Sequence, residues 1–506
     1  MIVKRITQFF GALVLLFVFT TGLLAAEHIR ILHWNDFHAQ NMPKVYKRRG
    51  KTIRIGGAAA LKAYLEKYGQ GKPWVVTVHA GDEFQGTPIS TLSRGMSQIE
   101  MLNLMRPDVF TLGNHEFDYG RDRLTSELKL LKIPVISANI FDKENGRLFV
   151  RPYLIKKVDG VRIGFIGVIT PDLLGLTLPK NVHGLEILSP EKTVEKYRRV
   201  IRDSVDLIVV VSHMGVHRDE ELAANVPGIA VIIGGHSHTV LKRPKIVNGT
   251  IICQAGAHGS YLGKLDLWVD TARDTIVRYN EKLIPVLTDS IRPNPVVAKK
   301  VAELEQQVSK QLDVVIAQLK TNWIRGNERS ESNLGDWEAD VMRTYAGTDV
   351  AFMNSGGLRK NVYAGPIRKR DFWEINPFGN YFVTFNVTGR ELRRILETNV
   401  NGKGEFLQVS GLKFTYDSRK PVGHRVLTVW VGGKPLNPDR TYSVCTNNFL
   451  AAQMYRNFGI PPKNHPLTRL NGMDRDIMIQ AAEKQKVIVS RVDGRIVDVA
   501  PRGKKR

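Results

Sequence analysis

The stretch "TLGNHEFDYG", residues 111–120, decides the fold because an apolar run ends there in a glycine and a group of polar side chains. Four polar residues follow Gly113: Asn114, His115, Glu116 and Asp118. Buried strands seldom end in side chains that cost so much to desolvate unless those side chains have a task. The stretch therefore predicts a functional site at the end of a buried strand.

Strand-like and helical runs alternate from residue 28 to about residue 285. The strand-like runs are "IRILHW", "WVVTVHA", "DVFTLG", "VRIGFIGV", "DLIVVVSHM", "AVIIGGHS" and "TIICQAG". Amphipathic stretches with helical spacing, such as "PEKTVEKYRRVIRD", lie between them. This alternation predicts a layered α/β domain, in which the strand ends and the loops after them are the usual place for a site.

Other strand ends carry aspartate and histidine in the same way. The runs are "HWNDFHAQ", "HAGDEFQG", "VSHMG" and "GGHSH", and their polar side chains are Asp36, His38, Asp82, His213, His236 and His238. Glycines among these runs let the backbone bend so that the side chains converge. Carboxylate, imidazole and amide oxygen suit zinc, manganese or a similar divalent ion, and the absence of cysteine among these ligands argues against a structural zinc site.

Length, composition and charge indicate a globular protein of more than one domain that favours anionic partners. A chain of 506 residues predicts two or more domains, and 43% hydrophobic with 24% charged residues is a globular composition. The net charge is +24, or +22 without residues 1–26, and favours anionic substrates or surfaces. The charges are scattered and no basic-aromatic recognition motif is present, so no specific nucleic acid partner is expected.

Residues 1–26 are predicted to be a secretory signal peptide. Lys4 and Arg5 precede an apolar run, and small residues end it near Ala26. The signal peptide predicts that the protein is periplasmic or secreted and that it has no membrane span after cleavage. An uncleaved N-terminal anchor is the alternative, because Leu24 at the −3 position weakens the cleavage site. The sequence does not indicate an oligomeric state.

The domain plan is two α/β domains with a helical connector. The first domain is expected over residues 27–290 and the second over residues 321–506. Between them, within 291–320, the run "NPVVAKKVAELEQQVSKQLDVVIAQL", residues 294–319, has helical spacing. Cys253 and Cys445 fall in different domains and in strand-like runs, so two buried free thiols are expected rather than a disulfide.

The order "NDFH…AGDEFQG…GNHEFD…SHMG…GGHSH" resembles the calcineurin-like metallophosphoesterases, and specifically the 5'-nucleotidase family. That family includes the periplasmic 5'-nucleotidase/UDP-sugar hydrolases and the 2',3'-cyclic-nucleotide phosphodiesterases. The resemblance implies a four-layered α/β/β/α metallophosphoesterase domain and a C-terminal α/β substrate-binding domain, joined by a helix. It covers nearly the whole chain after the predicted signal.

The resemblance also implies two divalent metal ions, commonly zinc or manganese, with cobalt, calcium or magnesium as alternatives. One ion would be held by Asp36, His38 and His238, and the other by Asn114, His213 and His236. Asp82 would bridge the two ions. A hydroxide held between two cations can exist near neutral pH and attack phosphorus in line.

His115 and Asp118 match the catalytic pair of the family. The imidazole of His115 would stabilise charge that develops on the phosphoryl oxygens or the leaving group, and Asp118 would orient it. Glu116 has no obvious inward role, so exposure to solvent or a supporting hydrogen bond is expected. His33, His79, His217 and His258 are not assigned as ligands and are expected to be structural or supporting residues.

The second half carries the family's substrate motifs. The runs "NWIRGNERSESNLGD", "MNSGGLRKN", "NPFGN" and "TNNFLAA" imply the substrate residues Arg325, Arg329, Asn354, Gly356, Arg359, Phe378 and Phe449. In the family two aromatic side chains enclose the base; without the resemblance, Phe378 and Phe449 would be interpreted as core residues. Relatives continue with a "GGDG" segment whose Asp binds ribose hydroxyls. This chain reads "AAQMYRNFG" there and places Tyr455 at that spacing, which concerns substrate choice rather than hydrolysis.

The leading functional hypothesis is an exported dinuclear-metal phosphoesterase that hydrolyses nucleotides, as a 5'-nucleotidase, a 2',3'-cyclic-nucleotide phosphodiesterase or both. One alternative is a hydrolase of the same fold with a non-nucleotide substrate, such as a thiosulfate ester. Another is a non-catalytic surface-binding protein, for which a missing metal ligand would be evidence; none of the expected ligands is missing.

Overall fold

The computed structural model describes residues 26–48, 51–326 and 329–500. The predicted signal peptide therefore lies outside the described residues except for Ala26. Within these ranges no helix is both long and apolar enough to cross a membrane.

The described chain divides into two compact units. The first runs as far as Phe84 and resumes over Gly95–Ala302, and the second comprises Gln85–Arg94 and the residues from Glu303 onward. The domain boundaries expected from the sequence remain a prediction.

The first unit is built on two six-stranded sheets. The first sheet has the order β17-β16-β1-β4-β5-β6, with β1 (Ala26–Trp34), β4 (Val75–His79), β5 (Val109–Thr111), β6 (Val135–Ile136), β16 (Tyr261–Asp270) and β17 (Thr275–Pro285). The second has the order β14-β15-β13-β12-β10-β9, with β9 (Tyr153–Val158), β10 (Val161–Ile169), β12 (Leu207–His213), β13 (Val231–Gly234), β14 (Lys245–Val247) and β15 (Thr250–Cys253). Smaller pairings involve β2 (Lys44–Arg48) with β3 (Lys51–Ile55), and β7 (Ile140–Asp142) with β8 (Arg147–Leu148) and β11 (Leu185–Ile187).

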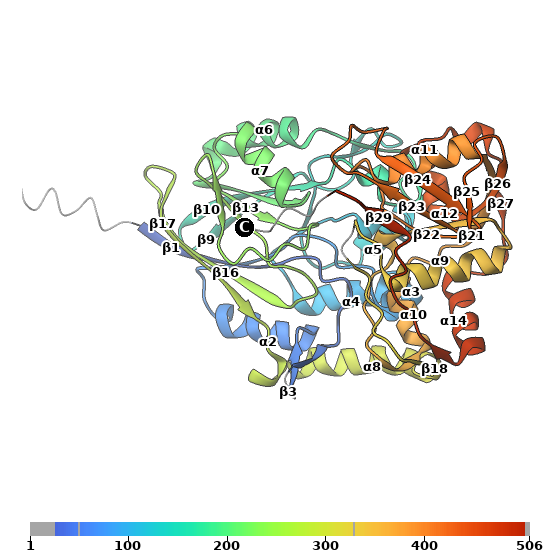
Figure 1. The fold of residues 1–506 in the computed structure, drawn as a ribbon. Helices are drawn as coiled ribbons and strands as arrows, with labels where there is room; N and C mark the ends of the chain where they lie inside the picture. Colours follow the sequence, from blue (N-terminus) through green and yellow to red (C-terminus); the bar gives the residue numbers. More distant parts are fainter. Residues whose placement is uncertain (1–25, 49–50, 327–328, 501–506) are drawn as a thin grey trace, which may run out of the picture. The chain divides into compact units, whose positions relative to one another are not determined.

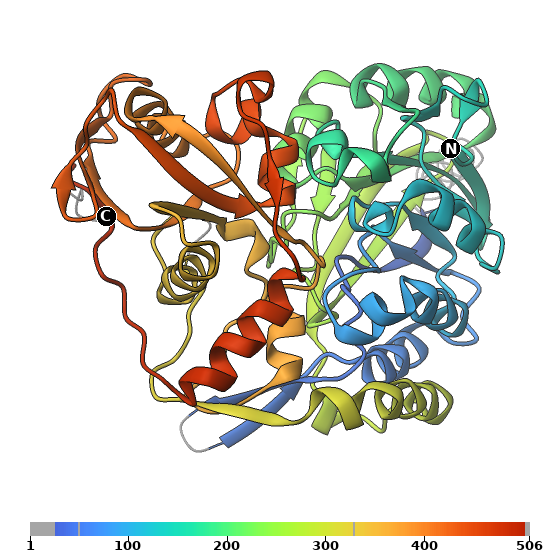
Figure 2. The same ribbon diagram turned by 90° about the vertical axis from the view of Figure 1, so that its right-hand side faces the viewer.

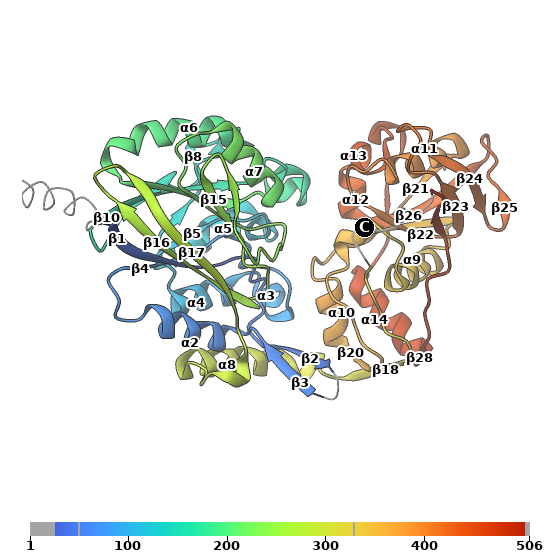
Figure 3. The same cartoon turned by 60° about the vertical axis from the view of Figure 1, so that its left-hand side comes forward.

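Helices cover the outer faces of both sheets. They are α2 (Ala58–Gly69), α4 (Met96–Met105), α5 (Arg121–Leu128), α6 (Pro190–Ile201) and α7 (Val216–Asn225). Val194 and Ile201 of α6 pack with Leu222 of α7 in the apolar cluster on the outer face of the second sheet. On the other side, α2 contacts β1 and β4, and α4 packs against α2 (Figure 1 and Figure 3).

An apolar layer fills the space between the two sheets. Ile29, Ile31 and Val78 enter it from the first sheet, and Val209 and Val211 enter it from the second. The alternate residue Val210 points to the helices instead, so β12 is buried on both faces. A strand buried on both faces needs a continuous apolar run, which "LIVVV" supplies. The four layers α/β/β/α expected from the sequence are confirmed.

The connecting helix is shorter than the sequence suggested. α8 spans Pro295–Leu312, and the last residues of the expected helix form β18 (Val315–Leu319). β18 pairs with β20 (Gly365–Arg368) and β28 (Val487–Ile488). The expectation of a helix over residues 315–319 was wrong because these residues bond to partners far away in the sequence, and such partners outweigh local spacing.

The described residues of the second unit form three sheets. A five-stranded sheet has the order β22-β19-β26-β21-β27, with β19 (Val350–Asn354), β21 (Phe382–Thr388), β22 (Leu407–Ser410), β26 (Thr441–Asn447) and β27 (Thr468–Arg469). A four-stranded sheet contains β23 (Leu412–Tyr416), β24 (Val426–Val431), β25 (Lys434–Pro435) and β29 (Ile496–Asp498), and the third is β20-β18-β28. The helices are α3 (Pro88–Ser93), α9 (Asn333–Ala346), α10 (Lys369–Ile375), α11 (Gly389–Asn399), α12 (Asn448–Ala452), α13 (Met454–Phe458) and α14 (Asp474–Gln485).

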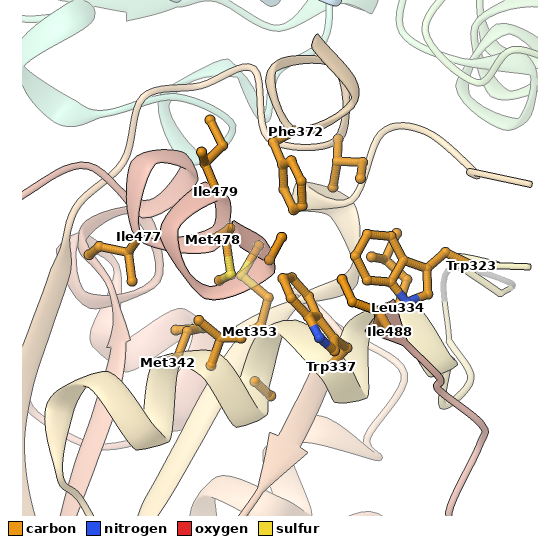
Figure 4. Packing of buried hydrophobic residues seen from close by; sticks show 14 of the residues in the cluster. Trp323, Leu334, Trp337, Met342, Met353, Phe372, Ile477, Met478, Ile479 and Ile488 are labelled. Carbon is orange, nitrogen blue, oxygen red and sulfur yellow. The ribbon is translucent and has the colours of Figure 1, made fainter. Parts of the chain in front are cut away.

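Two apolar clusters hold this second unit together, one on each face of β19. Ala351 and Met353 belong to the cluster with α9, α10 and α14, and the two last helices lie side by side in Figure 2 (orange and red). Trp323, Trp337 and Phe372 meet in this cluster, with the two indole rings 4.6 Å apart (Figure 4). Phe352 belongs to the other cluster, with α11.

Candidate active site

The seven predicted metal ligands lie at the carboxyl ends of strands in both sheets of the first unit. Asp36 and His38 follow β1, Asp82 follows β4 and Asn114 follows β5, and these three strands are parallel. His213 ends β12, and His236 and His238 follow β13, which is parallel to β12. Parallel neighbours end at the same edge of a sheet, which is why residues so distant in the sequence meet.

Asp36, His38 and His238 form one cluster. Their potential ligand atoms lie within 4.8 Å of one another. The Nε2 atoms of His38 and His238 are 3.0 Å apart, and Asp36 Oδ1 is 3.2 Å from His238 Nε2. Two imidazole nitrogens at this distance need a proton or a cation between them, because two lone pairs repel.

A second cluster combines His213 and His236 with Asp82, and Asn114 joins it. His236 Nδ1 lies 2.9 Å from Asn114 Oδ1, and His213 Nε2 lies 3.0 Å from Asp82 Oδ2. The same Asp82 Oδ2 is 3.8 Å from His38 Nε2 of the first cluster. The Asp82 carboxylate therefore faces both clusters, as a bridging ligand must.

The donor set fits divalent cations. His213 Nδ1 donates to the carbonyl of Ala80 at 2.7 Å, which leaves Nε2 to accept or to ligate. That Nε2 is buried, and although it lies 3.0 Å from Asp82 Oδ2, the contact does not have the geometry of a hydrogen bond. Although burial lowers the pKa of His213, the Asp82 carboxylate raises it to about 10, so the site favours positive charge at this nitrogen. A cation held by carboxylate, imidazole and amide oxygen would satisfy it.

The backbone around the two clusters is unusual. Asp36, His38, Asp82, His236 and His238 have φ between 51° and 76°, a region that residues other than glycine rarely adopt. Close packing also requires glycine: a Cβ on Gly113 would lie 2.2 Å from Asp82 Oδ1. The backbone bend that the sequence predicts at glycines of these runs is seen at Gly81 and Gly215, whose φ values are 83° and 91°.

His115 and Asp118 form a pair beside Asp82. His115 Nδ1 lies 2.6 Å from Asp118 Oδ2, and the His115 backbone N–H donates to Asp82 Oδ1 at 2.9 Å. Both side chains are about nine-tenths buried. The carboxylate holds the Nδ1 proton and so fixes the tautomer and orientation of the ring. His115 also groups with His38 and Asp82 as a potential ligand, so its catalytic role stays a prediction.

Glu116 is buried and its carboxylate organises the loop that carries Asp82. One oxygen accepts from the backbone N–H of Asp82 at 3.0 Å and of Gly113 at 2.6 Å. The other accepts from Glu83 at 2.8 Å and Phe84 at 3.1 Å. The expectation of solvent exposure was wrong, and the alternative of a supporting hydrogen bond is what the structure shows. Its position two residues after Asn114, in a short 3-10 turn, gave no sequence signal of this role.

Replacing Glu116 by glutamine is expected to lower metal affinity by about 10–100-fold, as losses of supporting bonds to metal ligands do. In glutamine, an NH₂ group replaces one of the two oxygens and would face two backbone N–H donors without accepting from them. The metal-free protein should therefore also lose about 1–3 kcal/mol of unfolding free energy. Metal titration measures the affinity, and denaturant unfolding measures the free energy of unfolding. Glu127→Gln is the control, because Glu127 is equally buried but bonds Arg123. Unchanged metal affinity in Glu116→Gln would contradict this role.

Three histidines that were not predicted to be ligands, His79, His217 and His258, differ in their surroundings. His79 Nε2 lies 2.9 Å from Glu83 Oε2, which supports the loop after β4. His217 is exposed. His258 lies beside the first cluster, with its ring 5.4 Å from His38 and 5.7 Å from His238, so it is closer to the site than the sequence suggested.

Most of the predicted substrate residues meet within the second unit. Asn354 ends β19, and its side-chain oxygen accepts from Asn447 at 2.9 Å. Arg359 Nη1 lies 3.5 Å from the carbonyl of Gly356, and its guanidinium lies 5.8 Å from the centre of the Phe378 ring. Arg325 donates to the carbonyl of Leu358 at 3.0 Å. The loop from 354 to 359 thus gathers these side chains.

Arg329, Phe378 and Phe449 complete the predicted set. Arg329 donates to the carbonyl of Gly404 at 3.1 Å. Phe378 and Phe449 are each half-buried, although Phe449 packs against the apolar cluster of α11. Each therefore keeps some exposed surface that a fully buried core residue would lack. Tyr455, which the sequence places at the spacing of the family's Asp, is 68% exposed on α13.

Comparisons with known proteins agree with this fold. A sequence profile of the calcineurin-like phosphoesterases matches residues 29–240, and a profile of the 5'-nucleotidase C-terminal domain matches residues 313–457. The molecule is thus a two-domain metallophosphoesterase with a 5'-nucleotidase C-terminal domain.

Comparisons with individual proteins identify the family. The solved 5'-nucleotidase precursor from Thermus thermophilus is 30% identical, with a TM-score of 0.87 over 94% of this chain and 100% of that chain. The 5'-nucleotidase of Vibrio cholerae is 28% identical over 84% of each chain. The endonuclease YhcR of Bacillus subtilis is 30% identical over 87% of this chain, which spans 39% of that protein's length. The chain belongs to the 5'-nucleotidase family of metal-dependent phosphoester hydrolases.

Proposed function

We propose that this protein is an exported phosphoesterase that uses two divalent metal ions to hydrolyse nucleotides. The observation that carries the proposal is the convergence of two clusters on one carboxylate, Asp82. Asp36, His38 and His238 would hold one ion, and Asn114, His213 and His236 the other. Zinc or manganese suits the oxygen and imidazole donors.

Two ions bound there would supply a strongly acidified water as nucleophile and neutralise phosphoryl charge. The protein's own part is to hold the groups around the phosphate. His115, with Asp118 on its Nδ1, would present its other nitrogen to the phosphoryl oxygens or the leaving group. Glu116 would keep Asp82 in place through its loop.

The second unit would bind the rest of the nucleotide. Phe378 and Phe449 would stack on the base, and Arg325, Arg329 and Arg359 would favour phosphate or carboxylate groups. Asn354 and Gly356 lie in the same loop region. Because no Asp follows Phe449 in the family's position, contact with the ribose hydroxyls must come from another group, or discrimination for ribose is weaker.

The test is an assay of purified protein with Mn²⁺ against AMP, cyclic 2',3'-AMP, UDP-glucose, a thiosulfate ester and bis-p-nitrophenyl phosphate. We expect the protein to hydrolyse a nucleotide, and we expect the rate to fall when a chelator removes the metal ions. Turnover of the thiosulfate ester alone would favour the non-nucleotide hydrolase. No turnover of any of these, with metal bound, would favour a non-catalytic binding protein.

Phe449→Ala is expected to raise KM for a nucleotide by about 5–150-fold with little change in kcat. Stacking of a base on an aromatic ring is worth about 1–3 kcal/mol, and its loss weakens ground state and transition state alike. KM for p-nitrophenyl phosphate, which carries no base, should not change in the same way. Tyr363→Ala, an exposed aromatic residue of the same unit, is the control. A fall in kcat alone would refute the stacking role.

Export rests on the N-terminal sequence. Cell fractionation should place the full-length chain in the periplasm or medium, and deletion of residues 1–26 should retain it in the cytoplasm. A full-length chain found in the cytoplasm would contradict export, and a chain of uncleaved mass in the membrane fraction would favour the N-terminal anchor.

A further inference from the structure

The apolar layer between the two sheets of the first unit contains a histidine and a glutamate beside a buried cysteine. They are His33 on β1, Glu281 on β17 and Cys253 on β15. The side chains of His33 and Glu281 are 0% and 1% exposed, and Cys253 is buried. These residues share none of the side chains of the candidate dinuclear centre.

The register of the strands places all three in this layer. Ile29 and Ile31 point into it from β1, and His33 is the next alternate residue. Glu281 pairs with Leu265 of β16, and directly paired residues share a face; Leu265 belongs to the inter-sheet cluster. Cys253 belongs to that cluster from the second sheet. Glutamate and histidine thus occupy positions that the strand pattern assigns to apolar residues, and such breaks of a local rule often mark a functional site.

The geometry of the group fits a metal ion. One nitrogen of His33, Cys253 Sγ and one oxygen of Glu281 all lie within 4.8 Å of one another. His33 Nε2 is 3.2 Å from Glu281 Oε1. Two ligands about 2.0–2.1 Å from a tetrahedral zinc ion lie roughly 3.3–3.4 Å apart, so this separation is close to what shared coordination needs.

The protein makes room for the imidazole at this point. Gly263 pairs with His33 across β1 and β16, and a Cβ on Gly263 would lie 2.0 Å from His33 Nε2. Any residue other than glycine would displace the ring edge that faces Glu281.

A hydrogen bond between His33 and Glu281 alone leaves this group incompletely satisfied. Glu281 Oε2 is buried and has no hydrogen-bond partner among the described residues. A buried carboxylate between two apolar sheets is costly unless positive charge and hydrogen bonds compensate it. Burial, with Glu281 adding to it, raises the pKa of the Cys253 thiol well above its usual value. A cation would reverse that preference and stabilise the thiolate and the carboxylate together.

We propose that His33, Cys253 and Glu281 form a third, mononuclear metal site that binds zinc between the two sheets. Thiolate and imidazole with one carboxylate select zinc over magnesium, calcium or manganese. The Cys253 thiol loses its proton as the ion binds, and no oxidation or reduction is involved. The ion ties β1 and β17 of the first sheet to β15 of the second, which is a structural rather than a catalytic task.

The test uses cobalt in place of zinc. A cobalt–thiolate bond gives an intense near-ultraviolet charge-transfer band, and the candidate dinuclear centre contains no sulfur ligand. The full chain, expressed in cobalt-supplemented medium so that the ion enters during folding, is expected to show this band. Cys253→Ser should abolish the band and remove one ion per chain. Cys445→Ser is the matched control, because Cys445 is also buried and free but lies in the second unit, and it should keep the band.

The result does not depend on the dinuclear centre. Asp82→Asn should keep the charge-transfer band even where it loses the other ions, so failure of the proposed hydrolytic function and failure of this site are distinguishable. Wild-type protein that binds cobalt without the band would overturn the third site, and so would a band that survives in Cys253→Ser. If Cys253→Ser does not fold, the wild-type spectrum still decides, because no other described cysteine lies in the first unit.

Discussion

Asp82→Asn is expected to lower kcat/KM for phosphoester hydrolysis by roughly 10³-fold or more, because loss of a bridging metal ligand removes several kcal/mol of transition-state stabilisation. One oxygen of Asp82 is 3.0 Å from His213 Nε2 and 3.8 Å from His38 Nε2, so it faces both clusters. Asparagine keeps an acceptor for the His115 N–H but has no negative charge to share between two cations. Kinetics with Mn²⁺ and metal analysis of the same sample measure the effect.

Asp206→Asn is the matched control for this substitution. Asp206 is also a buried aspartate of the first unit, but it bonds Arg162 just before β12 begins, whereas His213 ends that strand. It should therefore keep the metal content and lose little activity. An Asp82→Asn protein that still holds two ions and keeps activity within about tenfold of wild type would contradict the bridging role.

The strands that position the site were predictable because each is rich in apolar residues, and β5, β12 and β13 are buried on both faces. The run "LIVVV" of β12 is an example, since it faces the inter-sheet layer with Val209 and the helices with Val210. The polar residues at the ends of such strands interrupt a strong pattern and are easy to recognise. Fold and family were therefore accessible from the sequence.

Elements that depend on distant partners were not predictable in this way. Residues 315–319 have helical spacing after α8, yet they pair with β20 and β28. The pairing of β16 with β17 fixes where Glu281 points, and the alternation of "TIVRYNEKLIP" alone does not reveal that a glutamate faces the inter-sheet layer. Register is a property of two strands, so one strand's sequence does not determine it.

Supporting residues were the least predictable part of the site. Glu116 lies in the opening stretch beside three residues with expected roles, but its task is to accept hydrogen bonds from the backbone of residues 82–84 and Gly113. Backbone donors have no sequence signature. The sequence also did not reveal that the side chain of His79 contacts the side chain of Glu83.

His115→Gln is expected to lower kcat by about 10²–10⁴-fold while both metal ions remain bound, because it removes a positioned proton donor and not a ligand. Metal content decides between the two roles that the geometry allows, since His115 also lies near His38 and Asp82. Loss of an ion in this variant would assign His115 to the metal centre instead. His217→Gln, an exposed histidine of the same unit, is the control for the substitution.

The pairing of His115 with Asp118 gives a second measurement. If Asp118 acts only by holding the Nδ1 proton at 2.6 Å, Asp118→Asn should lower kcat through His115 alone. The double variant should then be no slower than His115→Gln, because residues that act as one unit do not have additive effects. Independent, additive losses would show that Asp118 acts on the substrate by a route that does not pass through the imidazole.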